Sequence, residues 1–142
     1  LSRDNTGGSK RLPINLVKGY FYDNPDEIIV DSIALDSFMK FKSFDLIFVD
    51  IEGSEFFAFK GMQKILQNSK VLITEFVPHH LKNVALISPL EFWNTLQPHF
   101  NHMFIPKSKR SFKGGDDILK QLTIIFNNNQ KHNNIVFSKL KL

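Results

Sequence analysis

The stretch FDLIFVDIEGSEFFAFKGMQKILQ, from Phe44 to Gln67, carries the strongest structural signals in this 142-residue chain. It opens with an apolar run, Leu46 to Val49, of the kind found in strands that are buried on both faces of a parallel sheet. Gly53 then permits a tight turn, and Ser54 is suited to cap a helix that follows. The pattern predicts a strand, a turn and a helix in succession.

Two carboxylates stand at the corner of this unit, because Asp50 ends the apolar run and Glu52 follows two residues later. Residues two apart on a strand project to the same side, and open α/β sheets bind ligands beyond the carboxyl ends of their strands. Asp50 and Glu52 could therefore bind a metal, act as a general base or hydrogen-bond the hydroxyls of a ligand. Alternatively, both only satisfy backbone donors at the turn and at the helix start.

A helix and a second strand are expected after this corner. Four apolar residues at helical spacing give the helix one apolar face: Phe56, Phe59, Met62 and Leu66. Asn68 and Ser69 end the helix, and residues 71–77 predict another buried strand, which Pro78 stops.

Glu75, His79 and His80 lie at the end of this second strand and so belong to the same edge of the sheet. A histidine is a plausible base for removing the proton of a hydroxyl. The alternative is an exposed histidine pair without a function. Nothing in the spacing demands a metal ion, although these oxygen and nitrogen ligands would suit magnesium, manganese or zinc.

The sequence VDIEGSEFFAFKGMQKIL, followed by VLITEF, resembles the signature of the FkbM-type methyltransferases. In that family an Asp-x-Glu-Gly-x-Glu sequence ends a central strand, a Lys-Gly or Arg-Gly pair follows, a Leu-Asp pair precedes it, and a Glu closes the next strand. The matching positions here are Leu35, Asp36, Asp50, Glu52, Gly53, Glu55, Lys60, Gly61 and Glu75.

The resemblance implies an S-adenosylmethionine-dependent O-methyltransferase of the Rossmann-like class. Its substrate would be the hydroxyl of a small molecule or a glycan, such as a sugar. We expect Asp50 and Glu52 to line the acceptor site, with Glu75 and His79 as further candidates. The expected fold is α/β, a Rossmann-like methyltransferase sheet that is mostly parallel, has an antiparallel C-terminal strand and lacks the first strands.

The family's main cofactor motif, a Gly-rich turn after the first strand, has no counterpart in this sequence. The pair Gly7-Gly8 follows a polar segment and has no apolar strand before it, so it indicates a loop. The resemblance therefore implies that residues 1–142 form the C-terminal portion of one methyltransferase domain, an internal fragment or a processed product. A sheet edge left exposed by absent strands would invite a homodimer.

Further elements are expected on either side of this central region. Strands are predicted at residues 14–17, 27–35 and 103–105, a short helix at 36–41 with Asp36 as its N-cap, and a hairpin from residues 122–126 and 135–137. Ser88-Pro89-Leu90-Glu91 predicts a helix that starts with a capping box and buries Leu90, Trp93 and Leu96.

Composition bounds the class of protein. A hydrophobic content of 42% is enough for one domain with a core, and no run is long enough to cross a membrane. The absence of cysteine excludes disulfides and thiolate metal sites and fits a cytoplasmic protein.

Positive charge gathers near the end of the chain, in a predicted flexible loop that holds Lys107, Lys109, Arg110 and Lys113. Such a loop could bind a polyanion or a partner, which would make the chain a non-catalytic, degenerate methyltransferase-like module. Alternatively it is solvated and serves solubility. No nucleic-acid-binding fold is recognisable, so a nucleic-acid partner is not expected.

Overall fold

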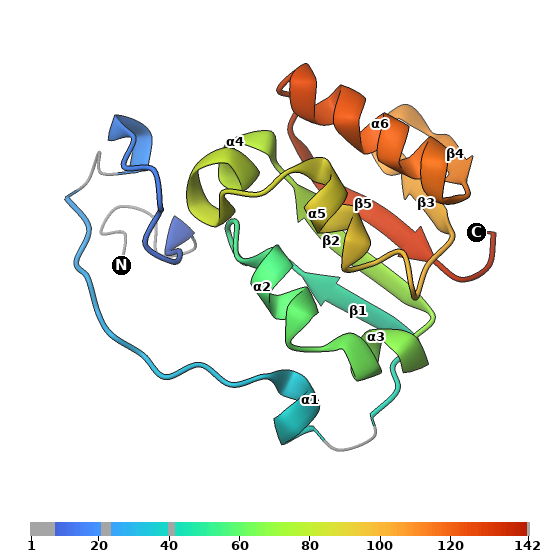
Figure 1. The fold of residues 1–142 in the computed structure, drawn as a ribbon, viewed down its shortest axis with the longest axis horizontal. Helices are drawn as coiled ribbons and strands as arrows, with labels where there is room; N and C mark the ends of the chain where they lie inside the picture. Colours follow the sequence, from blue (N-terminus) through green and yellow to red (C-terminus); the bar gives the residue numbers. More distant parts are fainter. Residues whose placement is uncertain (1–7, 21–23, 40–41, 142) are drawn as a thin grey trace.

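The computed structural model describes residues 8–20, 24–39 and 42–141. Within them the chain forms an α/β fold around a five-stranded sheet with the strand order β1-β2-β5-β3-β4 (Figure 1). The strands are β1 (Leu46–Val49), β2 (Val71–Phe76), β3 (His102–Ile105), β4 (Arg110–Lys113) and β5 (His132–Ser138).

The sheet is mixed, and most of its pairings are antiparallel. Strands β1 and β2 pair in parallel, whereas β2 with β5, β5 with β3, and β3 with β4 are antiparallel. The expectation of a mostly parallel sheet is therefore wrong. The sheet is mostly antiparallel because β5 lies between β2 and β3 and is antiparallel to both. The predicted antiparallel C-terminal strand is confirmed.

Helices cover one face of the sheet (Figure 1). The α-helices are α1 (Leu35–Phe38), α2 (Glu55–Lys60), α3 (Gln63–Asn68), α4 (Pro78–His80), α5 (Pro89–Asn94) and α6 (Gly115–Asn127). The π-helical turn η3 (Leu81–Ala85) continues α4, and short 3-10 turns occur at η2 (Lys18–Tyr20) and η4 (Pro106–Ser108). No helix in the described part of the chain is both long and apolar enough to span a lipid bilayer.

The core lies between these helices and alternate residues of the strands. Phe76 packs edge to face against Phe92 of α5 at 5.1 Å between ring centroids, and Trp93 stacks on Phe137 at 5.8 Å. All four side chains are at most 1% exposed. Each such side chain contributes about 1.5–3 kcal/mol on burial, so this layer holds α5 on the sheet.

The predicted strand, turn and helix at residues 44–67 are present, with two differences. The helix is broken at Gly61 and Met62 into α2 and α3, although Phe59, Met62 and Leu66 are buried as expected. Strand β1 lies at the edge of the sheet, so Leu46 and Phe48 are 54% and 59% exposed. The expectation that this strand is buried on both faces is wrong.

Three other predicted strands are absent. Residues 27–34 form no strand and Leu35 begins α1, while Ile29 is fully exposed; residues 14–17 also lack strand pairing. Residues 122–126 belong to α6, because Ile118, Leu122 and Ile125 are spaced for one helical face and are buried together. The predicted hairpin is therefore wrong, whereas strands at 103–105 and 135–137 are confirmed within β3 and β5.

Two further predictions concern the helix at Ser88 and the basic loop. Ser88 and Glu91 form the expected capping box at the start of α5, but Leu90 is half exposed and Phe92 is buried in its place. The basic residues do not form a flexible loop, since η4 and the paired edge strand β4 contain most of them. The helix expected at 36–41 is α1, and Lys40 and Phe41 lie outside the described residues, as Gly7 does.

Candidate active site

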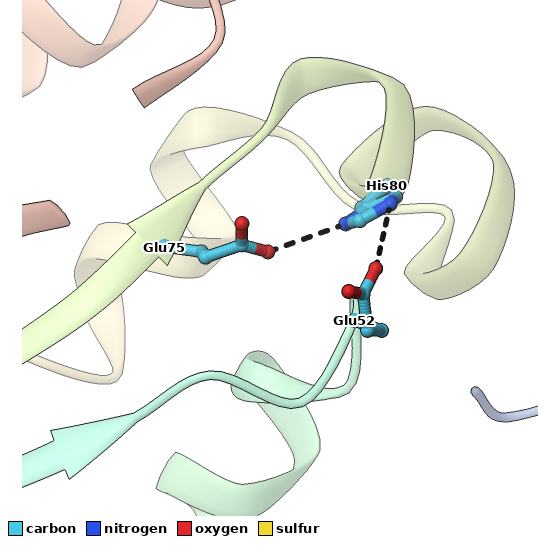
Figure 2. Close-up of side chains that lie close together, drawn as sticks. All are labelled: Glu52, Glu75 and His80. Atoms are coloured by element: carbon cyan, nitrogen blue, oxygen red, sulfur yellow. Dashed lines mark ion pairs between the residues drawn. The ribbon is translucent and has the colours of Figure 1, made fainter. Parts of the chain in front are cut away.

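The carboxyl ends of the parallel strands β1 and β2 meet at one corner of the sheet. The turn after β1 carries Glu52, the end of β2 carries Glu75, and α4 carries His80. Figure 2 shows both carboxylates pointing at the His80 ring. Glu52 Oε2 lies 3.6 Å from Nε2 and Glu75 Oε2 lies 3.6 Å from Nδ1. The imidazole is thus held between two carboxylates.

The turn that presents Glu52 has an unusual backbone. Glu52 and Gly53 have φ angles of 54° and 96°, in the left-handed region that favours glycine. A Cβ on Gly53 would lie 2.9 Å from His80 Cβ and 3.0 Å from Val84 Cβ. Glycine is therefore what allows the turn to approach α4 and brings Glu52 to His80.

Glu55 stabilises this turn from the inside. Its Oε1 accepts hydrogen bonds from the backbone N–H groups of Ile51 at 3.0 Å and Gly53 at 3.3 Å. The side chain is buried, and burial raises the pKa of its carboxyl group despite these hydrogen bonds; the charge of Glu75 acts in the same direction. Hydrogen bonding to backbone donors is the alternative role that the sequence allowed for Asp50 and Glu52. In the structure Glu55 has this role.

Glu75 is as buried as Glu55, but its carboxylate accepts no hydrogen bond from a described backbone N–H group. It is 5% exposed, and its buried Oε2 accepts no hydrogen bond from the described residues. His80 Nδ1 is also buried without a hydrogen-bond partner. At 3.6 Å the two atoms are too far apart for a good hydrogen bond between them, so both groups have unused bonding capacity.

Asp50 lies beside Glu75 rather than in a strand pair with Glu52. Strand β1 ends at Val49, so the expected alternation of Asp50 and Glu52 along a strand does not occur. One oxygen each of Asp50, Glu55 and Glu75 lie within 4.8 Å of one another. Desolvation, followed by the charge of Glu75, raises the pKa of Asp50, while Lys131 and His80 oppose the shift.

His79 does not join this cluster. Its ring faces Tyr20 at 4.9 Å between centroids, and its Nδ1 lies 3.1 Å from the Asn83 side chain. Burial, followed by the charges of His80 and Lys82, lowers its pKa. Adjacent residues on a helix point about 100° apart, so only one of two neighbouring histidines can face the carboxylates, and no sequence signal tells which.

Tyr20 is a neighbour of the site that the sequence did not indicate. Its hydroxyl donates a hydrogen bond to the His79 carbonyl at 3.3 Å, and its ring lies 6.3 Å from that of His80. Burial, then the charge of Glu52, raises the pKa of Tyr20 to about 12. The η2 turn therefore closes one side of the corner, through a contact between Tyr20 and His79, which are 59 positions apart in the sequence.

Two overlapping groups of side chains could hold a metal ion. The first consists of Glu52, Glu75 and His80, and the second of Asp50, Glu55 and Glu75; in each, one ligand atom per residue lies within 4.8 Å of the others. For S-adenosylmethionine, the described residues offer no Gly-x-Gly turn between a parallel strand and a helix, which is where a Rossmann-like site holds its nucleotide. The pair Gly114-Gly115 does precede α6, but it follows the antiparallel edge strand β4.

A surface hollow of about 410 Å³ lies away from this corner, lined by Gln97, Lys113, Gly114, Gly115, Asp116 and Asp117. Lys113 pairs with His102 at the start of β3, a strand that runs in the same direction as β2. The hollow is therefore at the opposite edge of the sheet and takes no part in the carboxylate corner.

The fold and the corner describe an α/β protein with a polar site beyond the carboxyl ends of two parallel strands. A family model described as the methyltransferase FkbM domain matches residues 2–121. The chain belongs to this family of methyltransferase domains, as the resemblance implied. No curated protein and no solved structure matches it significantly.

Proposed function

We propose that this chain takes part in methyl transfer from S-adenosylmethionine to a hydroxyl oxygen of a small molecule or a glycan, and that the carboxylate corner binds the acceptor. The observation that carries the proposal is the His80 imidazole held between Glu52 and Glu75, with Asp50 beside them, in a methyltransferase family member. Grouped proton acceptors at the carboxyl edge of a sheet are what an acceptor hydroxyl requires.

The chemistry divides between donor and acceptor. S-adenosylmethionine, when bound, supplies an electrophilic methyl group. The protein then has to orient the hydroxyl in line and accept its proton. Glu52 and His80 are partly accessible and suited to hydrogen-bond the acceptor, and the exposed carboxylate of Asp50 is suited to accept the proton. His79 remains a further candidate at the rim of the site.

The described residues are assigned only the acceptor side of the reaction. They contain no Gly-x-Gly turn between a parallel strand and a helix, so we assign no contact to the nucleotide part of S-adenosylmethionine. Binding of S-adenosylmethionine to the chain, measured by calorimetry, is therefore the first control in any activity assay.

Asp50→Asn tests the proposal. We expect at least a ~100-fold loss of turnover, since general base catalysis contributes about 10²–10⁴-fold, with an unchanged melting temperature. The assay measures S-adenosylhomocysteine released with a panel of sugars and small alcohols.

Asp45→Asn is the matched control, because Asp45 flanks the other end of β1, is exposed and pairs with Lys70 at 2.7 Å, away from the corner. Full activity of Asp50→Asn, or an equal loss in both variants, would show that the acceptor site is assigned incorrectly.

The polyanion-binding alternative stays a prediction. Lys107, Lys109, Arg110 and Lys113 are all exposed. However, Arg110 and Lys113 are three apart on β4 and project to opposite faces, which divides the charge. Retention on heparin that depends on salt, and that is lost when the four residues are neutralised, would support this alternative.

A further inference from the structure

The carboxylate corner has more negative charge than the described residues balance. Asp50, Glu52, Glu55 and Glu75 gather there, and two of them, Glu55 and Glu75, are 5% exposed. Glu55 is occupied by backbone donors, whereas the other three are not bound to the backbone by any described hydrogen bond. The basic side chains that face them are His80, at 3.6 Å from two carboxylates, and Lys131, whose charge acts on Asp50.

The surroundings of Glu75 point to a cation-binding role for this residue. Its side chain is 6% exposed, and Figure 2 shows it directed into the space beside His80. Its Oε2 is buried and accepts no hydrogen bond from the described residues. Burying a carboxylate oxygen that accepts no hydrogen bond is unfavourable, and a bound cation is one common way in which proteins compensate for it.

We propose that Glu52, Glu75 and His80 bind a divalent metal ion at the acceptor end of the site. One ligand atom from each lies within 4.8 Å of the others. Ligands of one ion at about 2.0–2.6 Å from it are at most about 4–5 Å apart, so the three atoms already lie within the span of one coordination sphere. The role of the ion rests on the proposed function, whereas its binding does not.

The two ring nitrogens of His80 would have different roles in such a site. Only one of them can face the ion, since Nε2 approaches Glu52 and Nδ1 approaches Glu75. When one ring nitrogen binds the ion, the other nitrogen carries the proton and lies beside a carboxylate oxygen to which it can donate. Metal-bound histidines in proteins are usually oriented in this way by a carboxylate.

The ligand set selects the class of metal. Two carboxylates and one imidazole are a mixed oxygen and nitrogen set, which suits Mn²⁺ best and also accepts Zn²⁺, while the absence of cysteine excludes a thiolate site. An ion here would act as a Lewis acid that lowers the pKa of a coordinated acceptor hydroxyl. The hydroxyl proton would then pass to a neighbouring carboxylate.

The test is Mn²⁺ binding by the whole chain after removal of metals with a chelator, followed by the EPR signal of free Mn²⁺ and by calorimetry. We expect one saturable site. Loss of an outer-shell partner alone typically weakens a site by about 10–100-fold, so Glu75→Gln and His80→Gln should each weaken binding by ~100-fold or more. His79→Gln is the matched control and should bind within about threefold of the unchanged chain.

Circular dichroism establishes that each variant is folded. If Glu75→Gln or His80→Gln fails to fold, Glu52→Gln decides, because Glu52 lies in a turn with its side chain 30% exposed. Absence of saturable binding overturns the proposal, as does binding that survives in the folded variants or that is lost equally in His79→Gln.

The outcome is separable from that of the proposed function. Saturable Mn²⁺ binding without any methyl transfer would support the metal site and contradict the proposed activity. Methyl transfer by a chain that shows no saturable Mn²⁺ binding would support the proposed activity and contradict the metal site.

Discussion

At the scale of single residues, Gly53 is where the backbone and the site depend on each other most directly. Its φ of 96° is unfavourable for any other residue, and a Cβ would meet His80 at 2.9 Å. We expect Gly53→Ala to lower the free energy of unfolding by about 1–3 kcal/mol, because it strains the turn and displaces α4.

Urea unfolding measures this change. Gly19→Ala is the control, since no atom lies within 4 Å of a Cβ there, and it should change stability by less than about 0.5 kcal/mol. Equal effects in the two variants would contradict the argument.

His99 predicts a pH dependence of stability. The Gln63 amide N–H donates to the carbonyls of Phe59 and Thr95, so its oxygen must accept from His99 Nε2 at 2.9 Å. Nδ1 is then the bare nitrogen, and it is buried without a partner. Burial, then the charge of Lys139, lowers the pKa of His99, although Asp36 opposes this shift.

The sign follows from linkage. In the folded state His99 takes up its proton at lower pH than in the unfolded chain, where the pKa is about 6.5. Its contribution to stability is therefore present above pH 6.5 and is lost as the pH falls through the folded value. His132 acts in the same direction, because burial and then Lys107 lower its pKa. Melting temperatures at pH 7.5 and 5.5 should differ less in His99→Gln than in the unchanged chain; equal differences would exclude His99 as a cause.

At the scale of elements, Asp36 connects two segments that are distant in sequence. Its carboxylate accepts from the backbone N–H groups of Lys64 at 2.9 Å and Ile65 at 3.1 Å, at the start of α3. The prediction that Asp36 is the N-cap of its own helix is wrong, because Ala34 holds that position in α1 and Asp36 lies in the first turn; its carboxylate instead caps α3.

We expect Asp36→Ala to destabilise the fold by about 0.5–2 kcal/mol, the usual cost of losing a helix cap. Chemical denaturation measures it, and Asp31→Ala, at an exposed position of the same segment, is the control. If the two variants unfold alike, the long-range cap contributes nothing to stability.

Elements were predictable where their signals are local. The capping box at Ser88, the end of β1 before Gly53 and the stop at Pro78 depend on neighbours a few residues away, and the structure contains all three. The apolar run 122–126 misled the prediction because four or five apolar residues satisfy a strand and a buried helix equally. Only packing of α6 against α5 and the sheet distinguishes the two.

At the scale of the whole molecule, the described residues leave both edge strands of the sheet, β1 and β4, without a partner on their outer side. Among the described residues β1 pairs only with β2, and Leu46 and Phe48 are more than half exposed. The opposite edge strand β4 carries Arg110 and Lys113, and charges of this kind discourage pairing with another chain. Self-association, if it occurs, should therefore use β1.

The homodimer through an exposed sheet edge stays a prediction, and Leu46→Lys tests it. Light scattering over a range of concentrations should show association of the unchanged chain and its loss in Leu46→Lys. Leu90→Lys should leave association unaltered, since Leu90 is similarly exposed, at 50% against 54%, but lies on α5. A chain that is monomeric at every concentration would contradict the prediction.

The sequence by itself determined the family, the central strand, turn and helix, and the edge of the sheet at which the carboxylates gather. These follow from motif residues, backbone preferences and apolar spacing, all of which act over a few positions. Only the tertiary structure decided that His80, and not His79, faces Glu52 and Glu75, that Tyr20 closes the corner, and that β5 separates β2 from β3. Those outcomes depend on contacts between distant segments, whose geometry is set by the packing of the helices on the sheet.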